Sequence, residues 1–171
     1  MKATLIIKGA KKFELELGFE DFSQIVSNLP DTAEHADLFD LLSEHPSIAI
    51  REYVAMKDNL AESTVKRLAA DRDVSVIRSL LRSSKGQEFL STAQLLEMIS
   101  RDVEAAESVA NQVEAFDSAD IDELAAALLK HGDARVRNSL AGNSSAPKKI
   151  LKTLLKDPDP NVRASAQQSL D

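Results

Sequence analysis

The sequence contains no cysteine and no tryptophan, and its 171 residues include one tyrosine and six phenylalanines. Without cysteine, disulfides, thiolate nucleophiles, thiolate zinc sites and cysteine-bound iron–sulfur clusters are all excluded. Because aromatic residues are so scarce, the core must be made mainly of Leu, Ala, Val and Ile. That composition suits closely stacked helices.

Long apolar runs are also missing. No stretch approaches the ~20 apolar residues of a membrane helix, and residues 1–17 show a short apolar run followed by alternation, unlike a signal peptide. We therefore expect a cytoplasmic protein that does not contact the membrane. With 43% hydrophobic and 29% charged residues, the chain suits one domain or one short array with a buried core.

The net charge of −7 is distributed unevenly. Residues 1–44 carry −5, residues 45–100 carry +1, residues 101–130 carry −6 and residues 131–171 carry +3. An acidic middle next to a basic end can steer a charged partner or favour head-to-tail self-association.

A short pattern recurs along the chain. The pair Val162–Arg163 aligns with Val136–Arg137, and the same template places further anchors at positions 51, 77 and 106. The anchors are 26, 29, 31 and 26 residues apart, a period typical of solenoids. We expect a mostly α fold, a short right-handed α-solenoid of helical pairs over residues 45–171, preceded by a capping segment over residues 1–44.

The capping segment has a different pattern. Ala3–Lys8 is apolar and β-branched, and alternation follows after a turn at Gly9–Lys12, which predicts a β-hairpin. A lone hairpin is marginal in water, so its face of Phe13, Leu15 and Leu17 should turn inward against a helix or another strand edge. Helices are expected over residues 19–29 and 32–43.

The last unit has the clearest local signals. Its first helix is expected over Ala134–Ala141, ended by a left-handed residue at Gly142 or Asn143, and Pro147 should open a second helix that reaches Lys156. The final helix, residues 161–170, has the polar flank of an end repeat. The two longer periods imply insertions at Ser83–Ser91 and Phe116–Ile121, which should form loops between paired helices.

The stretch Asp-Pro-Asp-Pro-Asn-Val-Arg at residues 157–163 resembles a HEAT-type repeat, and residues 136–163 are similar to the leucine-rich repeat variant branch of that group. The resemblance covers the C-terminal two-thirds of the chain. It implies a structural ladder in which Asp157 pairs with Arg163. The ladder should be interrupted where other residues replace its members: His45 and His131 at the Asp position, and Ile77 and Ala106 at the Arg position.

Two patterns suggest a metal site, one formed by Glu-His pairs and the other by a cluster of acidic residues. Some HEAT-type hydroxylases bind iron with His-Glu pairs, but Glu34–His35 and Glu44–His45 have the reverse order, and we interpret them as structural. The acidic cluster lacks the glycine of a calcium loop and fits the first turn of a helix capped by Asp117 or Ser118. Its members are Asp117, Asp120, Asp122 and Glu123. We predict no metal, no cofactor and no catalytic residue.

A basic patch is expected from Lys148, Lys149, Lys152 and Lys156, with Arg135 and Arg137 nearby. Nucleic-acid binding, including a HEAT-like DNA glycosylase, is therefore an alternative. It is disfavoured because the chain is acidic and has no aromatic residue after Phe116 to stack on a base.

The favoured function is a non-enzymatic scaffold that binds another protein. A metal-dependent enzyme is a further alternative. Self-association could use either the hairpin or head-to-tail charge pairing. The expected partner-binding residues are the four lysines with Arg135, and the acidic cluster.

Overall fold

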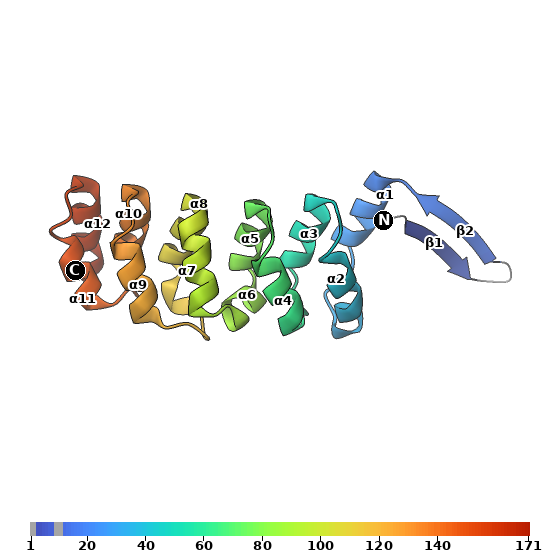
Figure 1. Cartoon of the computed structure of the whole chain (residues 1–171), viewed down its shortest axis with the longest axis horizontal. Coiled ribbons are helices and arrows are strands. Elements are labelled where there is room, and N and C mark those ends of the chain that lie inside the picture. Colours follow the sequence, from blue (N-terminus) through green and yellow to red (C-terminus); the bar gives the residue numbers. More distant parts are fainter. Residues whose placement is uncertain (1–2, 9–11) are drawn as a thin grey trace.

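The computed structural model describes residues 3–8 and 12–171, and it is mostly helical with a small antiparallel sheet at its N-terminal end (Figure 1). The sheet is the predicted hairpin of β1 (Ala3–Lys8) and β2 (Lys12–Leu17). Residues 9–11 of the predicted turn and the side chain of Phe13 lie outside what the structure describes.

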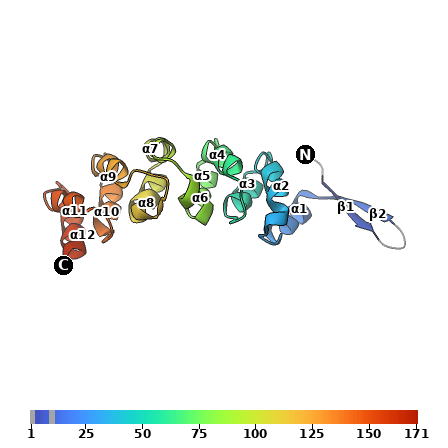
Figure 2. The ribbon, with the colours of Figure 1, turned by 90° about the horizontal axis from the view of Figure 1, so that it is seen from below.

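The expectation that the hairpin turns its apolar face inward is wrong for Leu5 and Leu15, which lie opposite each other on the two strands. The register pairs Leu5 with Leu15 and Ala3 with Leu17, which places these four side chains on one face of the sheet. Leu5 is 37% exposed and Leu15 is 59% exposed. The reason is topological, because the helices continue away from the hairpin and leave it projecting from one end (Figures 1 and 2).

Helices occupy most of the remaining chain. The predicted helix over residues 19–29 is α1, and it ends two residues earlier, at Ser27. The predicted helix over residues 32–43 is split into a 3-10 turn, η1, and a short helix, α2. The bounds are α1 Phe19–Ser27, η1 Ala33–His35, α2 Ala36–Leu42, α3 Ile48–Ala55, α4 Glu62–Ala69, α5 Val74–Leu81, α6 Ser84–Phe89, α7 Thr92–Arg101, α8 Val103–Asn111, η2 Val113–Ala115, α9 Ile121–Leu129, α10 Ala134–Gly142, α11 Lys148–Leu154 and α12 Pro160–Leu170.

The helices lie in two rows that run the length of the molecule (Figures 1 and 2). In the first row, each helix contacts the next in the order α1, α3, α5, α8, α10 and α12. The second row contains α2, α4, α7, α9 and α11, with direct packing of α7 on α9 and of α9 on α11, while the short helix α6 packs on both α4 and α5. A first-row helix and the second-row helix that follows it are called a unit below.

The sequence anchors occupy one structural position. Residues 51, 77, 106, 137 and 163 are each the fourth residue of a first-row helix, namely α3, α5, α8, α10 and α12. The fourth residue of α1 is Phe22. The spacing in the sequence therefore corresponds to a repeated place in the fold, and α1 and α2 continue the two rows into residues 1–44.

The core lies between the two rows and has the predicted composition. Leu, Val, Ile and Ala dominate it, and Phe39 and Phe116 are its large aromatic members. Leu140 and Leu154 are buried as expected, whereas Leu155 is only half-buried. At the fourth position of α8, the small and fully buried Ala106 permits close packing of neighbouring first-row helices.

The two predicted insertions lie between paired helices, but neither is a free loop. Ser83–Ser91 contains helix α6, because the Ser83 hydroxyl accepts the Gly86 N–H at 3.0 Å and caps it. A Cβ on Gly86 would collide with the Leu80 carbonyl oxygen, so α6 packs closely on α5. In Phe116–Ile121, the Phe116 side chain is 1% exposed and anchors the segment in the core.

The helix ends of the last unit differ from the prediction in detail. No described residue has a positive φ, so neither Gly142 nor Asn143 is left-handed. Asn143 instead follows α10 with an extended backbone, and its side-chain amide donates to the Ala110 carbonyl at 3.2 Å and to Glu114 at 2.8 Å. Pro147 is the residue before α11 rather than part of its first turn. Pro160 is the first residue of α12, where its missing N–H is tolerated.

Candidate functional site

The predicted pairing of the Asp157 carboxylate with Arg163 is wrong. The Asp157 carboxylate does not bind Arg163. It accepts two hydrogen bonds from Arg137 of the preceding unit, at 2.7 and 3.1 Å. The guanidinium of Arg163 donates instead to the backbone carbonyls of Asp157 and Pro158, at 2.7 and 2.9 Å. The carboxylate therefore links two units, and the arginine six residues later closes the turn within its own unit.

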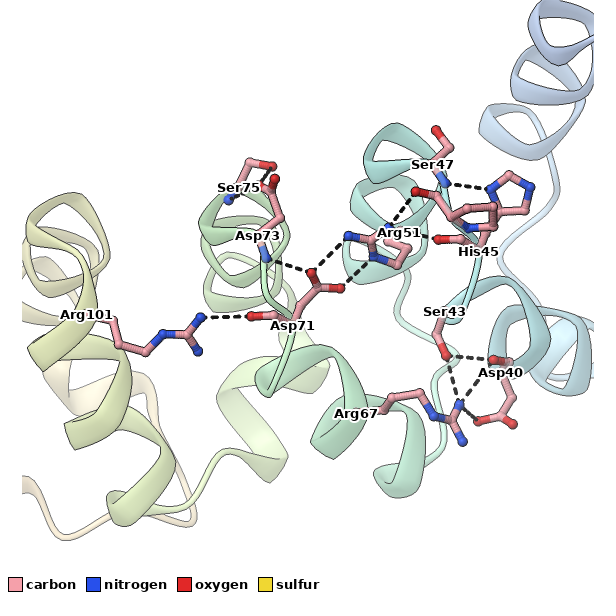
Figure 3. Close-up of polar contacts among 11 residues, drawn as sticks. Asp40, Ser43, His45, Ser47, Arg51, Arg67, Asp71, Asp73, Ser75 and Arg101 are labelled. Carbon is pink, nitrogen blue, oxygen red and sulfur yellow. Dashed lines mark hydrogen bonds and ion pairs between the residues drawn. The ribbon is translucent and has the colours of Figure 1, made fainter. Parts of the chain in front are cut away.

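The same arrangement occurs near the other end of the molecule, where Figure 3 shows it. Arg51 donates two hydrogen bonds to the Asp71 carboxylate, at 2.6 and 3.0 Å, and a further one to the His45 carbonyl at 2.8 Å. Both pairs are largely buried, with side-chain exposures of 6% and 7% for Arg51 and Asp71, and of 13% and 5% for Arg137 and Asp157. The bonds from Arg137 hold the pKa of Asp157 below its ordinary value, and the bonds to Asp71 raise the pKa of Arg51.

The ladder is interrupted in the middle of the chain, as the sequence predicts. Ile77 and Ala106 are buried at the fourth position of α5 and α8 and make apolar contacts there. A neighbouring residue, Arg78, forms ion pairs with Asp102 at 4.0 Å and with Glu104. The sequence did contain a signal for the correct pairing, since an Arg is followed twenty residues later by an Asp at both ends of the array.

A second polar cluster lies near the Arg51–Asp71 pair (Figure 3). Arg67 of α4 contacts Asp40 at 2.8 Å, the Ser43 hydroxyl at 2.8 Å and Glu44 at 3.1 Å. Hydrogen bonds from Thr64 and then from Arg67 lower the pKa of Asp40. Ser43, Glu44 and Arg67 border a surface pocket of about 310 Å³, together with Arg51 and Asp71. Arg51 binds Asp71 and Arg67 binds Glu44 at its border, so we interpret these charged groups as structural links between neighbouring helices.

The predicted basic patch is exposed on α11 and just after it. Lys148, Lys149, Lys152 and Lys156 all face solvent, and none forms an ion pair with a residue that the structure describes. Arg135 is different, because it belongs to the first row and its guanidinium binds Asp133 at 3.0 Å. The structure therefore keeps the four lysines together but separates Arg135 from them. Arg137, also placed near this patch, is buried in the ladder.

The acidic cluster opens helix α9, the second-row neighbour of α11. Asp120, rather than Asp117 or Ser118, caps this helix by accepting the Glu123 N–H at 3.0 Å. Asp117, Asp122 and Glu123 are exposed and, like Asp120, form no ion pair within the described residues. The acidic cluster and the lysines thus lie on adjacent second-row helices without neutralising each other.

The histidines considered as metal ligands make other contacts in the structure. His35 shares a hydrogen bond of 2.9 Å with the Thr32 hydroxyl, and His45 accepts the Ser47 N–H at 3.1 Å. Across residues 3–8 and 12–171, no group of three or more His, Asp or Glu side chains is arranged to hold a metal ion. In the same part of the chain, every helix is too short or too polar to cross a bilayer.

Comparison of the chain with models of known protein families, with curated proteins and with solved structures finds no match.

Proposed function

We propose that this protein is a non-enzymatic scaffold, a right-handed HEAT-like α-solenoid that presents one of its faces to another protein in the cytoplasm. Three features support the solenoid: two rows of helices, anchors that recur at the fourth position, and Arg–Asp pairs between successive units. Arrays of this kind are built by stacking, and they offer extended surfaces for binding.

The observation that carries the binding proposal is the pair of exposed charged surfaces on α9 and α11. Buried Arg–Asp pairs elsewhere show that this fold neutralises charges that serve its own structure. The four lysines and the acidic cluster have no such partners among the residues that the structure describes. Exposed charges of this kind accelerate association with a partner of complementary charge.

A charge-reversal experiment tests the proposal. Reversing Lys148, Lys152 and Lys156 to Glu should slow the association of a partner isolated with the wild-type chain, and should flatten the salt dependence of the rate. The fold should be retained because all three side chains are exposed. Binding is measured by surface plasmon resonance at two salt concentrations, after affinity isolation and mass spectrometry identify the partner.

A matched control has the same change in net charge elsewhere. Lys66, Arg72 and Arg82 are exposed on or beside α4 and α5, and their reversal to Glu should leave association nearly unchanged. Equal binding by both triple variants would remove the α11 surface from the proposal. A partner that is lost on nuclease treatment would replace protein binding with nucleic-acid binding.

A further inference from the structure

Two histidines occupy a position that aspartate holds elsewhere in the array. At the turn before a first-row helix, one side chain accepts the backbone N–H of the residue two positions later. The four cases are Asp71 from Asp73 at 2.9 Å, Asp157 from Asp159 at 2.9 Å, His45 from Ser47 at 3.1 Å and His131 from Asp133 at 3.1 Å. In the two histidines, the acceptor is Nδ1.

This contact fixes the protonation state of each ring. A backbone N–H can only donate, so Nδ1 of His45 and of His131 must carry a free lone pair. In the neutral ring, the proton therefore lies on Nε2. A second proton on Nδ1 would point at the N–H of Ser47 or Asp133, so the hydrogen bond and the protonated ring exclude each other.

The histidines stand where the ladder has no arginine. Asp71 and Asp157 each receive a second contact, from Arg51 and Arg137 at the fourth position of the preceding first-row helix. Before His131, the fourth residue of α8 is Ala106. Before His45, the fourth residue of α1 is Phe22, whose ring lies 5.6 Å from the imidazole. An aspartate at either place would lack its cation, whereas a neutral imidazole closes the turn without a charge.

The surroundings of the His45 ring oppose a positive charge. His45 is 6% exposed. Burial first, and then the charge of Arg51, lower the pKa of its imidazole. The charged groups around it come from its own turn, from α3, from α4 and from the α4–α5 turn: Glu44, Arg51, Arg67, Asp71 and Arg72. Around His131 they are Arg137, which donates to its carbonyl at 2.8 Å, and Asp133.

We propose that His45 and His131 are acid-sensitive joints of the array. Protonation of either ring breaks the hydrogen bond that closes its turn and loosens the first-row helix that follows, α3 or α10, from the unit before it. The turns at Asp71 and Asp157 remain closed at the same pH, because each carboxylate is bound by an arginine of the preceding unit. Mild acid thus opens the chain at two defined places, before residues 45 and 131, and leaves the Arg51–Asp71 and Arg137–Asp157 links intact.

Nuclear magnetic resonance of the full-length chain tests the ring state directly. At pH 8, the ¹⁵N signals of His45 and His131 should report the Nε2–H tautomer. On titration to pH 5, the amide signals of Ser47 and Asp133 should shift and lose protection from exchange, while those of Asp73 and Asp159 should not. An Nδ1–H tautomer in either ring, or equal loss of protection at all four amides, would overturn the proposal.

Substitution by asparagine provides a second, independent test. Asparagine can make the same contact without titrating, as Asn143 does here by accepting the Ser145 N–H at 2.9 Å. His45 contributes stability fully above the unfolded-state pKa near 6.5 and loses it as the pH falls toward its lower pKa in the folded state. A tenfold preference of the fold for a neutral ring corresponds to about 3–5 °C in Tm for a chain of this length.

The wild-type Tm should therefore fall between pH 7.5 and 5.0, and His45→Asn with His131→Asn should reduce that fall. His35→Asn is the matched control, since a hydroxyl such as that of Thr32 can either donate to a ring nitrogen or accept from it. The control should keep the wild-type pH dependence. If the double Asn variant keeps it as well, the joints are not acid-sensitive.

Discussion

Removal of the Asp157 carboxylate should be one of the most damaging single changes at the polar sites of this protein. Asp157→Ala deletes two hydrogen bonds from Arg137 and leaves the Asp159 N–H without its acceptor. It also leaves a guanidinium that is only 13% exposed without its counter-ion. Breaking a buried pair in this way costs about 3–5 kcal/mol. Arg137 keeps its contacts to two backbone carbonyls, so we expect about 2–4 kcal/mol.

Arg163→Ala should be milder. Its guanidinium is exposed and donates to carbonyls rather than to a carboxylate, so the expected loss is about 0.5–1.5 kcal/mol. Asp122→Ala, at an exposed carboxylate, is the control and should stay within about 0.5 kcal/mol of wild type. Urea unfolding at pH 7, followed by circular dichroism, gives these free energies of unfolding.

A double-mutant cycle decides which arginine the carboxylate binds. The coupling energy between Asp157 and Arg137 should be about 1–3 kcal/mol, and the coupling between the Asp157 carboxylate and Arg163 should be close to zero. The reverse order would refute the link between units and restore the pairing within one unit.

Three further outcomes can be measured. Leu154→Ala should cost about 2–5 kcal/mol in urea unfolding, because the side chain is 1% exposed and its loss leaves a cavity; an unchanged midpoint would contradict its burial. Gly86→Ala should destabilise strongly because its Cβ would collide with the Leu80 carbonyl, whereas Gly142→Ala, with nothing within 4 Å of its Cβ, should be neutral or stabilising by up to about 1 kcal/mol. Similar Tm values for both glycine variants would argue against close packing of α6. Asp157→Asn should flatten the loss of stability below about pH 4, since the folded-state pKa lies below 3.8 and the stabilisation disappears only as the pH falls through it; an acid transition that matches wild type would contradict the lowered pKa.

The sequence by itself determined the helical composition and the recurring position in the fold. The anchors are spaced so that each becomes the fourth residue of a first-row helix, from Arg51 in α3 to Arg163 in α12. This prediction succeeded because a helix that packs in a row must present equivalent residues to its neighbours at each repeat. The hairpin followed from alternation within a few residues, which depends only on local geometry.

Two local features could not be predicted from the sequence, because they depend on contacts in the folded chain. Ser83–Ser91 contains few strong helix signals, yet it forms α6 because Ser83 caps it and Gly86 fits against the Leu80 carbonyl. The exposure of Leu15 could not be predicted either, since an apolar strand face indicates that something should cover it but does not indicate what. Neither result depends on a pattern that a single sequence displays.

The pairing in the ladder shows the limit most clearly. At a period of 26 residues, Asp157 lies six residues before Arg163 and twenty residues after Arg137, so the sequence contains both separations for the same chemical pair. The repeat determined that an Asp and an Arg would meet. Only the stacking of α10 on α12 decided that the carboxylate binds the arginine of the preceding unit, because that contact is made in space between units.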